Sequence, residues 1–232
     1  MIKVEIVIPC YNEEENLESL WTECLKVVQE SNKEVTFIIV DNGSTDNSSQ
    51  FMNSHSDLND NIRFIAIQPN KGYGGGIIAG LEQTSAPYIG WTHADLQTPL
   101  RDCIIAKNFF ESGFEFIKGS RAGRSLADNF FSSGMGLVTS LLFQKRLWEV
   151  NAQPTLMNRS IFVSWLNPPN DFSLDLYALV MAKNEKLKIA RFKVIFLKRL
   201  RGESKWNSGF LSRYKFIIRT MRYSLKLRWI VR

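Results

Sequence analysis

The sequence contains only three cysteines among its 232 residues, and no two of them form a C-x-x-C pair. Cys10, Cys24 and Cys103 therefore indicate neither a disulfide framework nor a zinc site. A reducing, cytoplasmic compartment fits this cysteine usage best.

Long apolar runs are also missing. No run approaches the roughly 18 to 20 residues that a helix needs to span a bilayer. The opening residues, MIKVEIVIP, reach a proline before a secretory apolar core is complete, so we expect no leader peptide. We therefore expect a protein that can touch a membrane without crossing it.

Acidic residues are scarce at one end of the chain. From Lys198 onward there are 11 Lys or Arg and one acid, Glu203, which makes this segment +10, whereas the remainder is −4. Such asymmetry indicates a local surface for phosphates, anionic lipid or nucleic acid.

Residues 208–232 have apolar residues at helical spacing with basic residues between them. This pattern predicts a basic amphipathic helix that binds an anionic membrane surface or docks one packed face on the protein, and both can hold together. Without a reading motif, we expect no nucleic-acid partner.

Strands and helices alternate in the first part of the sequence. Apolar runs at Lys3–Pro9, Val35–Val40 and Asn61–Ile67 predict buried strands, and Glu14–Glu30 has helical spacing. This order predicts an α/β sheet with right-handed crossovers. Ligands of such sheets bind beyond the carboxyl ends of the strands, where the polar loops PCYNEEEN and DNGSTDNS lie.

The stretch WTHADLQTP follows a predicted short strand, Tyr88–Trp91. Asp95 and Gln97 are two residues apart, so in an extended segment they point the same way. A carboxylate and an amide oxygen suit a hard cation such as Mg²⁺ or Mn²⁺. The alternative is a helix N-terminus capped by Thr98 with a solvated aspartate nearby.

The glycine-rich stretch NKGYGGGIIAGLEQ passes from a loop into a predicted helix. A dinucleotide-phosphate loop is disfavoured because the stretch follows the third strand and lacks the acid that the fingerprint requires. The alternative is a glycine-rich helix start that packs against a strand.

The middle of the chain contains a predicted strand at Phe114–Lys118, followed by the Gly/Ser-rich sequence GSRAGR. Arg121 and Arg124 in this predicted loop are candidate phosphate contacts, although solvated arginines are the alternative. Phe130–Val150 is mostly helical in pattern.

Two aspartates accompany the next predicted helix, Phe172–Asn184. Asp171 precedes the helix and Asp175 lies in its first turn, where the helix dipole favours a carboxylate. Cap chemistry and catalysis are both open for these residues. Lys186–Leu197 alternates as a strand does, and KRLRGESKW follows.

The segments PCYNEEEN, VDNGSTDNS, NKGYGGGIIAG, HADLQTP, KGSR and RLRGESKW occur in this order. Together they resemble the ordered motifs of the family 2 glycosyltransferases, and within them most closely the dolichol- or polyprenyl-phosphate sugar synthases. The resemblance implies a GT-A fold: a single Rossmann-like, mostly parallel sheet flanked by helices, here with a C-terminal basic amphipathic helix. We expect one domain, 1–232, with a nucleotide-binding half at 1–120, an acceptor half at 121–207 and the basic helix at 208–232.

The resemblance also implies roles for residues of the loops. It assigns base and ribose contacts to Pro9, Tyr11, Glu13 and Asp41, and the metal that bridges the donor diphosphate to Asp95 and Gln97. We add Gly72 and His93 to the nucleotide-binding candidates. His93 stands where the family usually has an acid, and neutral imidazole suits Mn²⁺ better than Mg²⁺.

The implied reaction moves a sugar, with inversion, from a nucleotide-diphospho sugar to a polyprenyl or dolichyl phosphate or to a growing glycan. A lipid phosphate needs cations, for which the candidates are Arg121, Arg124, Arg199, Arg201 and Lys205. A sugar hydroxyl needs a base instead, for which Asp175 is the first candidate and Asp171 the second.

Two interpretations other than this enzyme remain open. The first is a catalytically weakened nucleotide-sugar-binding partner in a membrane-associated glycan-assembly complex. The second is a nucleotidyltransferase, which also uses such a sheet but releases pyrophosphate. For either membrane role we expect a cytoplasmic protein that is peripheral at the cytoplasmic membrane face.

Overall fold

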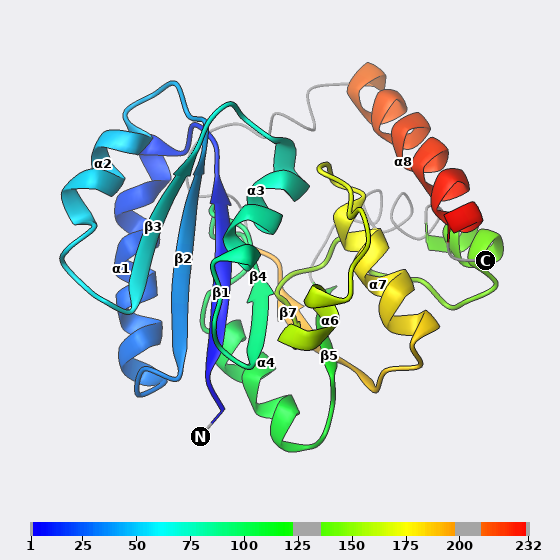
Figure 1. Cartoon of the computed structure of the whole chain (residues 1–232), viewed down its shortest axis with the longest axis horizontal. Helices are drawn as coiled ribbons and strands as arrows, with labels where there is room; N and C mark the ends of the chain where they lie inside the picture. Colours follow the sequence, from blue (N-terminus) through cyan, green and yellow to red (C-terminus); the bar gives the residue numbers. More distant parts are fainter. Residues whose placement is uncertain (1, 123–135, 198–209, 231–232) are drawn as a thin grey trace.

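The structure is a computed structural model that describes residues 2–122, 136–197 and 210–230. Within these residues, strands alternate with helices and form a seven-stranded sheet in the order β3-β2-β1-β4-β6-β5-β7 (Figure 1). The strands are β1 (Val4–Cys10), β2 (Val35–Asn42), β3 (Ile62–Ile67), β4 (Tyr88–Trp91), β5 (Phe116–Ala122), β6 (Thr155–Asn158) and β7 (Ile189–Ile195). The helices are α1 (Glu14–Glu30), α2 (Ser48–His55), α3 (Gly72–Glu82), α4 (Asp102–Glu111), α6 (Arg159–Val163), α7 (Leu174–Asn184) and α8 (Phe210–Ile230).

The sheet is mostly parallel. β1 pairs in parallel with β2 and β4, β2 pairs with β3, and β5 pairs with β7. Only β6, among the strands described, runs antiparallel, between β4 and β5. The carboxyl ends of β1, β2 and β4 therefore meet at one edge of the sheet, as the sequence predicted.

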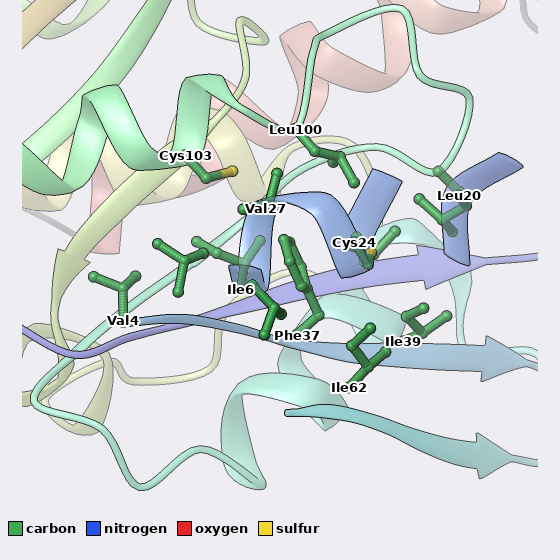
Figure 2. Close-up of a cluster of buried hydrophobic side chains, with 14 of the residues drawn as sticks. Val4, Ile6, Leu20, Cys24, Val27, Phe37, Ile39, Ile62, Leu100 and Cys103 are labelled. Atoms are coloured by element: carbon green, nitrogen blue, oxygen red, sulfur yellow. The ribbon is translucent and has the colours of Figure 1, made fainter. Parts of the chain in front are cut away.

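One face of the sheet packs against α1, α2 and α4. Side chains alternate along a strand, so Val4, Ile6 and Ile8 of β1 all point to this face and are buried. Figure 2 shows this cluster, in which Phe37 of β2 lies among side chains from the strands and helices. Cys24 and Cys103 are part of it, and both are free thiols whose pKa is raised by burial.

The other face packs against α3, α6 and α7. Val7, Ile38 and Val40, which alternate with the first set, belong to a second buried cluster with side chains of these helices. Leu227 of α8 is also fully buried there. Figure 1 shows α8 on the α7 side of the molecule, at the opposite end from α2.

Two local predictions are wrong, and the predicted 130–150 helix holds only in part. β5 continues to Ala122, so Arg121 lies in a strand and not in a loop, because it pairs with Val194 of β7. In the described part of the predicted 130–150 helix, helical structure ends at residue 143. Thr98 does not cap α4, which begins at Asp102 with Arg101 in the N-cap position.

No helix among the described residues combines the length and the apolar character that crossing a membrane requires.

Candidate functional site

The loops after β1 and β2 are bound to each other by hydrogen bonds. The backbone amide of Asn12 donates to Ser44 Oγ at 3.0 Å, and the amide of Thr45 donates to Asn12 Oδ1 at 2.8 Å. Gly43, with φ +73°, lies so close to the third loop that a Cβ atom would be 2.7 Å from the backbone nitrogen of Asn70. Three loops that are distant in sequence thus form one surface at the carboxyl edge of the sheet.

The candidate nucleotide residues of the first two loops lie on this surface. Asp41 is the second-last residue of β2 and is 2 % exposed; its Oδ1 accepts from the Ser44 amide at 2.9 Å, and its Oδ2 accepts from Ser49 Oγ. Tyr11 is 41 % exposed and follows β1 directly. Glu13 accepts a 2.6 Å hydrogen bond from Asn16 Nδ2 and precedes α1. Asp41 therefore holds its loop in shape, while Tyr11 presents an aromatic ring to solvent.

Pro9 and Gly72 lie where α3 meets the strands. Asn42, at the end of β2, accepts from the Lys71 amide at 2.9 Å and donates to the Gly72 carbonyl at 2.8 Å. A Cβ on Gly76 would be 3.3 Å from Pro9 Cβ, and one on Gly72, whose φ is +80°, would be 2.5 Å from the Asn170 carbonyl oxygen. The glycines of this stretch thus allow close packing within the protein, as the alternative interpretation predicted.

The Asp95–Gln97 segment forms a tight turn beyond β4. Asp95 Oδ1 accepts from the Gln97 amide at 3.1 Å, and Leu96 between them has φ +55°. Two hydrogen bonds join this turn to Leu197, two residues after β7: Leu197 N donates to the Gln97 carbonyl at 2.8 Å, and Gln97 Nε2 donates to the Leu197 carbonyl at 3.2 Å. The turn is therefore held from both halves of the chain.

The donor set of this turn fits a hard cation that completes its coordination with ligand oxygens. Asp95 and Gln97 could each supply an oxygen, and His93 lies two residues before Asp95. No group of three or more His, Cys, Asp or Glu side chains that could hold a metal occurs in the described ranges. These two side chains would provide only part of a coordination shell, and Mg²⁺ commonly takes the rest from phosphates and water.

Asp175 lies in a buried polar cluster that the sequence did not predict. Its Oδ1 accepts from Gln153 Nε2 at 2.9 Å, Trp91 Nε1 at 3.2 Å and Lys118 Nζ at 3.3 Å, and its Oδ2 accepts from Tyr73 Oη at 3.3 Å. Asp175 is 1 % exposed, and Lys118 is fully buried. Burial lowers the pKa of Lys118 to about 8, although the Asp175 carboxylate opposes the shift. The sequence contains one signal for this cluster: Lys118 directly follows the apolar residues Phe116 and Ile117 in β5.

Asp171 acts as a local cap. Its Oδ1 accepts from the Ser173 amide at 2.8 Å, and its carbonyl accepts from the Leu174 amide at 3.1 Å. It therefore orders the entry into α7, and its catalytic role stays a prediction, as does that of Asp175.

Of the five candidate acceptor cations, only Arg121 lies in the described residues. Its Nε donates to Glu149 Oε2 at 2.8 Å, and its guanidinium lies 5.9 Å from the centre of the Phe196 ring. Arg121 is thus an ion-paired arginine whose side chain is mostly buried. Arg124, Arg199, Arg201 and Lys205 fall outside the residues that the structure describes.

Comparison with known proteins identifies the family of the chain and several similar proteins. The sequence model described as "Glycosyl transferase family 2" matches residues 5–164. The undecaprenyl-phosphate 4-deoxy-4-formamido-L-arabinose transferase of Proteus mirabilis (strain HI4320) is 34 % identical over 131 residues, which are 56 % of this chain and 39 % of that protein. The protein of the same name from Serratia proteamaculans (strain 568) is 25 % identical over 211 residues, covering 88 % of this chain and 63 % of that protein. The chain thus spans less than two thirds of the length of these relatives.

Solved structures confirm the predicted GT-A architecture. Glucosyl-3-phosphoglycerate synthase from Mycobacterium tuberculosis, in complex with Mn²⁺, uridine diphosphate and phosphoglyceric acid, aligns with a TM-score of 0.73. The alignment covers 98 % of this chain and 78 % of that one at 17 % identity. At this identity the similarity shows the fold alone.

Proposed function

Because the chain belongs to the family 2 glycosyltransferases, we propose that it transfers a sugar, with inversion, from a nucleotide-diphospho sugar to a polyprenyl phosphate. The observation that carries the proposal is the Asp95–Gln97 turn, which follows β4 at the same carboxyl edge of the sheet as the joined loops after β1 and β2. The names of the relatives, which are undecaprenyl-phosphate sugar transferases, support the acceptor class.

In this proposal Asp95 and Gln97 hold Mg²⁺ or Mn²⁺. The cation would supply positive charge to the diphosphate that leaves, which is electrostatic stabilisation of the transition state. The exposed ring of Tyr11 offers a stacking surface to the donor base, and Asp41 keeps the adjoining loop in place. Pro9, Glu13, Gly72 and His93 complete the proposed nucleotide surface.

The transfer itself forms a bond between an acceptor phosphate oxygen and the anomeric carbon. The bond from that carbon to the donor diphosphate breaks, and its electron pair leaves with the nucleoside diphosphate. A phosphate monoester has a second pKa of about 6 and is largely ionised at neutral pH, so the attack requires no base. This agrees with Asp175, which is buried and accepts hydrogen bonds from four side chains.

Arg191 adds a candidate contact for the acceptor phosphate. It pairs in register with Lys118, and its guanidinium stacks on Trp148 at 4.4 Å. Burial lowers the pKa of Arg191 to about 10, and its buried Nη1 has no hydrogen-bond partner among the residues that the structure describes. A phosphate oxygen would give this nitrogen the partner that buried polar groups require.

The proposal places the protein at the cytoplasmic face of a membrane. In α8, Leu227 and Ser224 are buried against the protein, whereas Leu225 and Trp229, four residues apart, are 50 % and 77 % exposed. One face of α8 therefore docks, and another offers an apolar and aromatic surface with basic neighbours, which suits an anionic bilayer.

The direct test is a transfer assay. Purified protein is incubated with a panel of UDP- and GDP-sugars, Mn²⁺ or Mg²⁺, and either undecaprenyl phosphate or a sugar-hydroxyl acceptor. We expect a polyprenyl phosphosugar and free nucleoside diphosphate. Transfer to the hydroxyl alone would refute the phosphate acceptor, and a complete lack of transfer and hydrolysis would favour the non-catalytic nucleotide-sugar-binding partner.

A further inference from the structure

The buried cluster around Asp175 includes Tyr73, a side chain near the start of α3. The Tyr73 hydroxyl donates to Asp175 Oδ2 at 3.3 Å and accepts from Gln153 Nε2 at 3.3 Å. Asp175 is itself fixed by the buried ammonium group of Lys118, which also donates to Thr155 Oγ1 at 2.7 Å. The hydroxyl end of Tyr73 therefore has a defined position.

The ring of Tyr73 stacks on two other rings. It lies parallel to Phe172, with ring centroids 4.3 Å apart and an interplanar angle of 2°. It also stacks on His93, with ring centroids 5.5 Å apart and an interplanar angle of 29°. Offset stacks at these separations contribute favourably beyond the area that they bury. Phe172, Tyr73 and His93 thus form a stack from the start of α7 to the segment after β4.

His93 is two residues before Asp95 in the same segment, so the position of its ring affects the turn that we assign to the metal. We propose that Tyr73 is a positioning residue for the donor site: its hydroxyl is held by the Asp175–Lys118 pair, and its ring holds His93 beside the Asp95–Gln97 turn. This inference rests on the proposed function. In this proposal Asp175 anchors the Tyr73 hydroxyl and does not act as a base. His93 stands where the family usually has an acid, and the Tyr73 ring holds the imidazole in position.

The first test needs no ligand, because the chain has only two histidines, His55 and His93. His55 stacks on Phe51 at 4.0 Å, on the face of the sheet opposite Tyr73, and serves as an internal reference. Proton NMR at one fixed pH compares wild type with Tyr73→Leu, Asp175→Asn and the control Tyr88→Phe, which loses a hydroxyl on the other face of the sheet.

We expect Tyr73→Leu to shift the His93 ring signals strongly, because the ring current of its neighbour is lost. Asp175→Asn shifts or broadens the same signals, while the His55 signals and the Tyr88→Phe spectrum stay unchanged. Unchanged His93 signals in Tyr73→Leu would overturn the proposed support. The result holds whether or not the wild type transfers sugar, so a failure of the proposed function is seen separately in the transfer assay.

The second test measures whether Tyr73 affects binding of the nucleotide donor. Calorimetry measures UDP and GDP binding with Mn²⁺, and steady-state rates separate KM from kcat. We expect Tyr73→Phe, which keeps the ring, to weaken binding by about tenfold, equivalent to one hydrogen bond to a charged group. Tyr73→Leu should weaken it further. A purely structural role would lower the melting temperature of both variants with equal donor KM, and this result would contradict the inference.

Discussion

We expect the buried carboxyl of Asp102 to give the protein a specific pH response. Asp102 lies in the first turn of α4 and is 9 % exposed, and its Oδ2 has no hydrogen-bond partner within the described part of the chain. Burial raises the pKa of Asp102 from an ordinary 3.8 to about 6. Between these values the folded state keeps a proton that the unfolded state releases, so this contribution to stability is present below pH 4 and is lost as the pH rises through 6.

Replacing this carboxyl should remove the pH response. We predict that Asp102→Asn gains stability relative to wild type as the pH rises from 4 to 7.5, by at most about 3 kcal/mol for a shift of roughly two pKa units. Urea unfolding at both pH values measures the difference. Asp60→Asn, at an exposed position, is the control. An Asp102→Asn difference that does not change with pH would contradict the assignment.

The residues of the site differ in how far the sequence reveals them. Asp95 and Gln97 are visible because both belong to one short motif, and the structure keeps them in one turn. Lys118, Tyr73 and Gln153 are not visible as a group, since they are brought together only when α3, β5 and the segment before β6 pack against α7. Periodicity reports which face a residue occupies but not which distant partner it meets.

At the scale of elements, the packing of α3 on the sheet depends on a small residue. A Cβ added at Gly80 would be 2.4 Å from Val7 Cγ1 and 2.9 Å from Val40 Cγ2. Both valines are stiff, buried side chains of adjacent strands. The glycine is therefore needed for the close approach of the helix to β1 and β2.

This contact predicts that a normally stabilising substitution destabilises. Gly80→Ala should lower the free energy of unfolding by about 1–3 kcal/mol through overpacking, although alanine is the better helix former. Combining it with Val7→Ala, which makes room, should cost less than the sum of the two single changes. Denaturant unfolding of the two single variants and the double variant measures these free energies. A higher free energy of unfolding in the single variant Gly80→Ala than in wild type would refute the packing argument.

The elements themselves were mostly predictable. The strands β1 to β4, the helix α1 and the glycine-rich start of α3 follow from apolar periodicity and from composition. Errors occur where tertiary pairing overrides local pattern: β5 extends through Gly119 and Arg121 because β7 pairs with it. The antiparallel insertion of β6 could not be predicted either, since a four-residue strand has no distinctive pattern.

At the scale of the whole molecule, the charge asymmetry and α8 support the proposed orientation of the protein on a membrane. The segment from Lys198 onward carries +10, and the remainder carries −4. With Leu225 and Trp229 exposed on α8, the basic end would face an anionic bilayer.

Flotation with vesicles of phosphatidylglycerol and phosphatidylcholine tests this orientation. We predict that the double change Leu225→Ala and Trp229→Ala reduces the bound fraction and that added salt reduces it further. Leu58→Ala removes an apolar side chain that is 64 % exposed near α2, and it should leave flotation unchanged. Equal losses in both variants would contradict a specific membrane face.

The central claim is that Asp95 and Gln97 hold a cation that binds the donor diphosphate. Calorimetric titration of UDP and GDP, with and without Mn²⁺, into wild type, Asp95→Asn and the control Asp60→Asn tests it most directly. Asp95→Asn keeps an acceptor for the Gln97 amide but removes the charge, so the fold of the turn is retained. The account predicts metal-dependent binding by wild type and by Asp60→Asn, and at least a tenfold loss, about 1.4 kcal/mol, in Asp95→Asn. Equal affinity of Asp95→Asn and wild type in the presence of Mn²⁺ would contradict it.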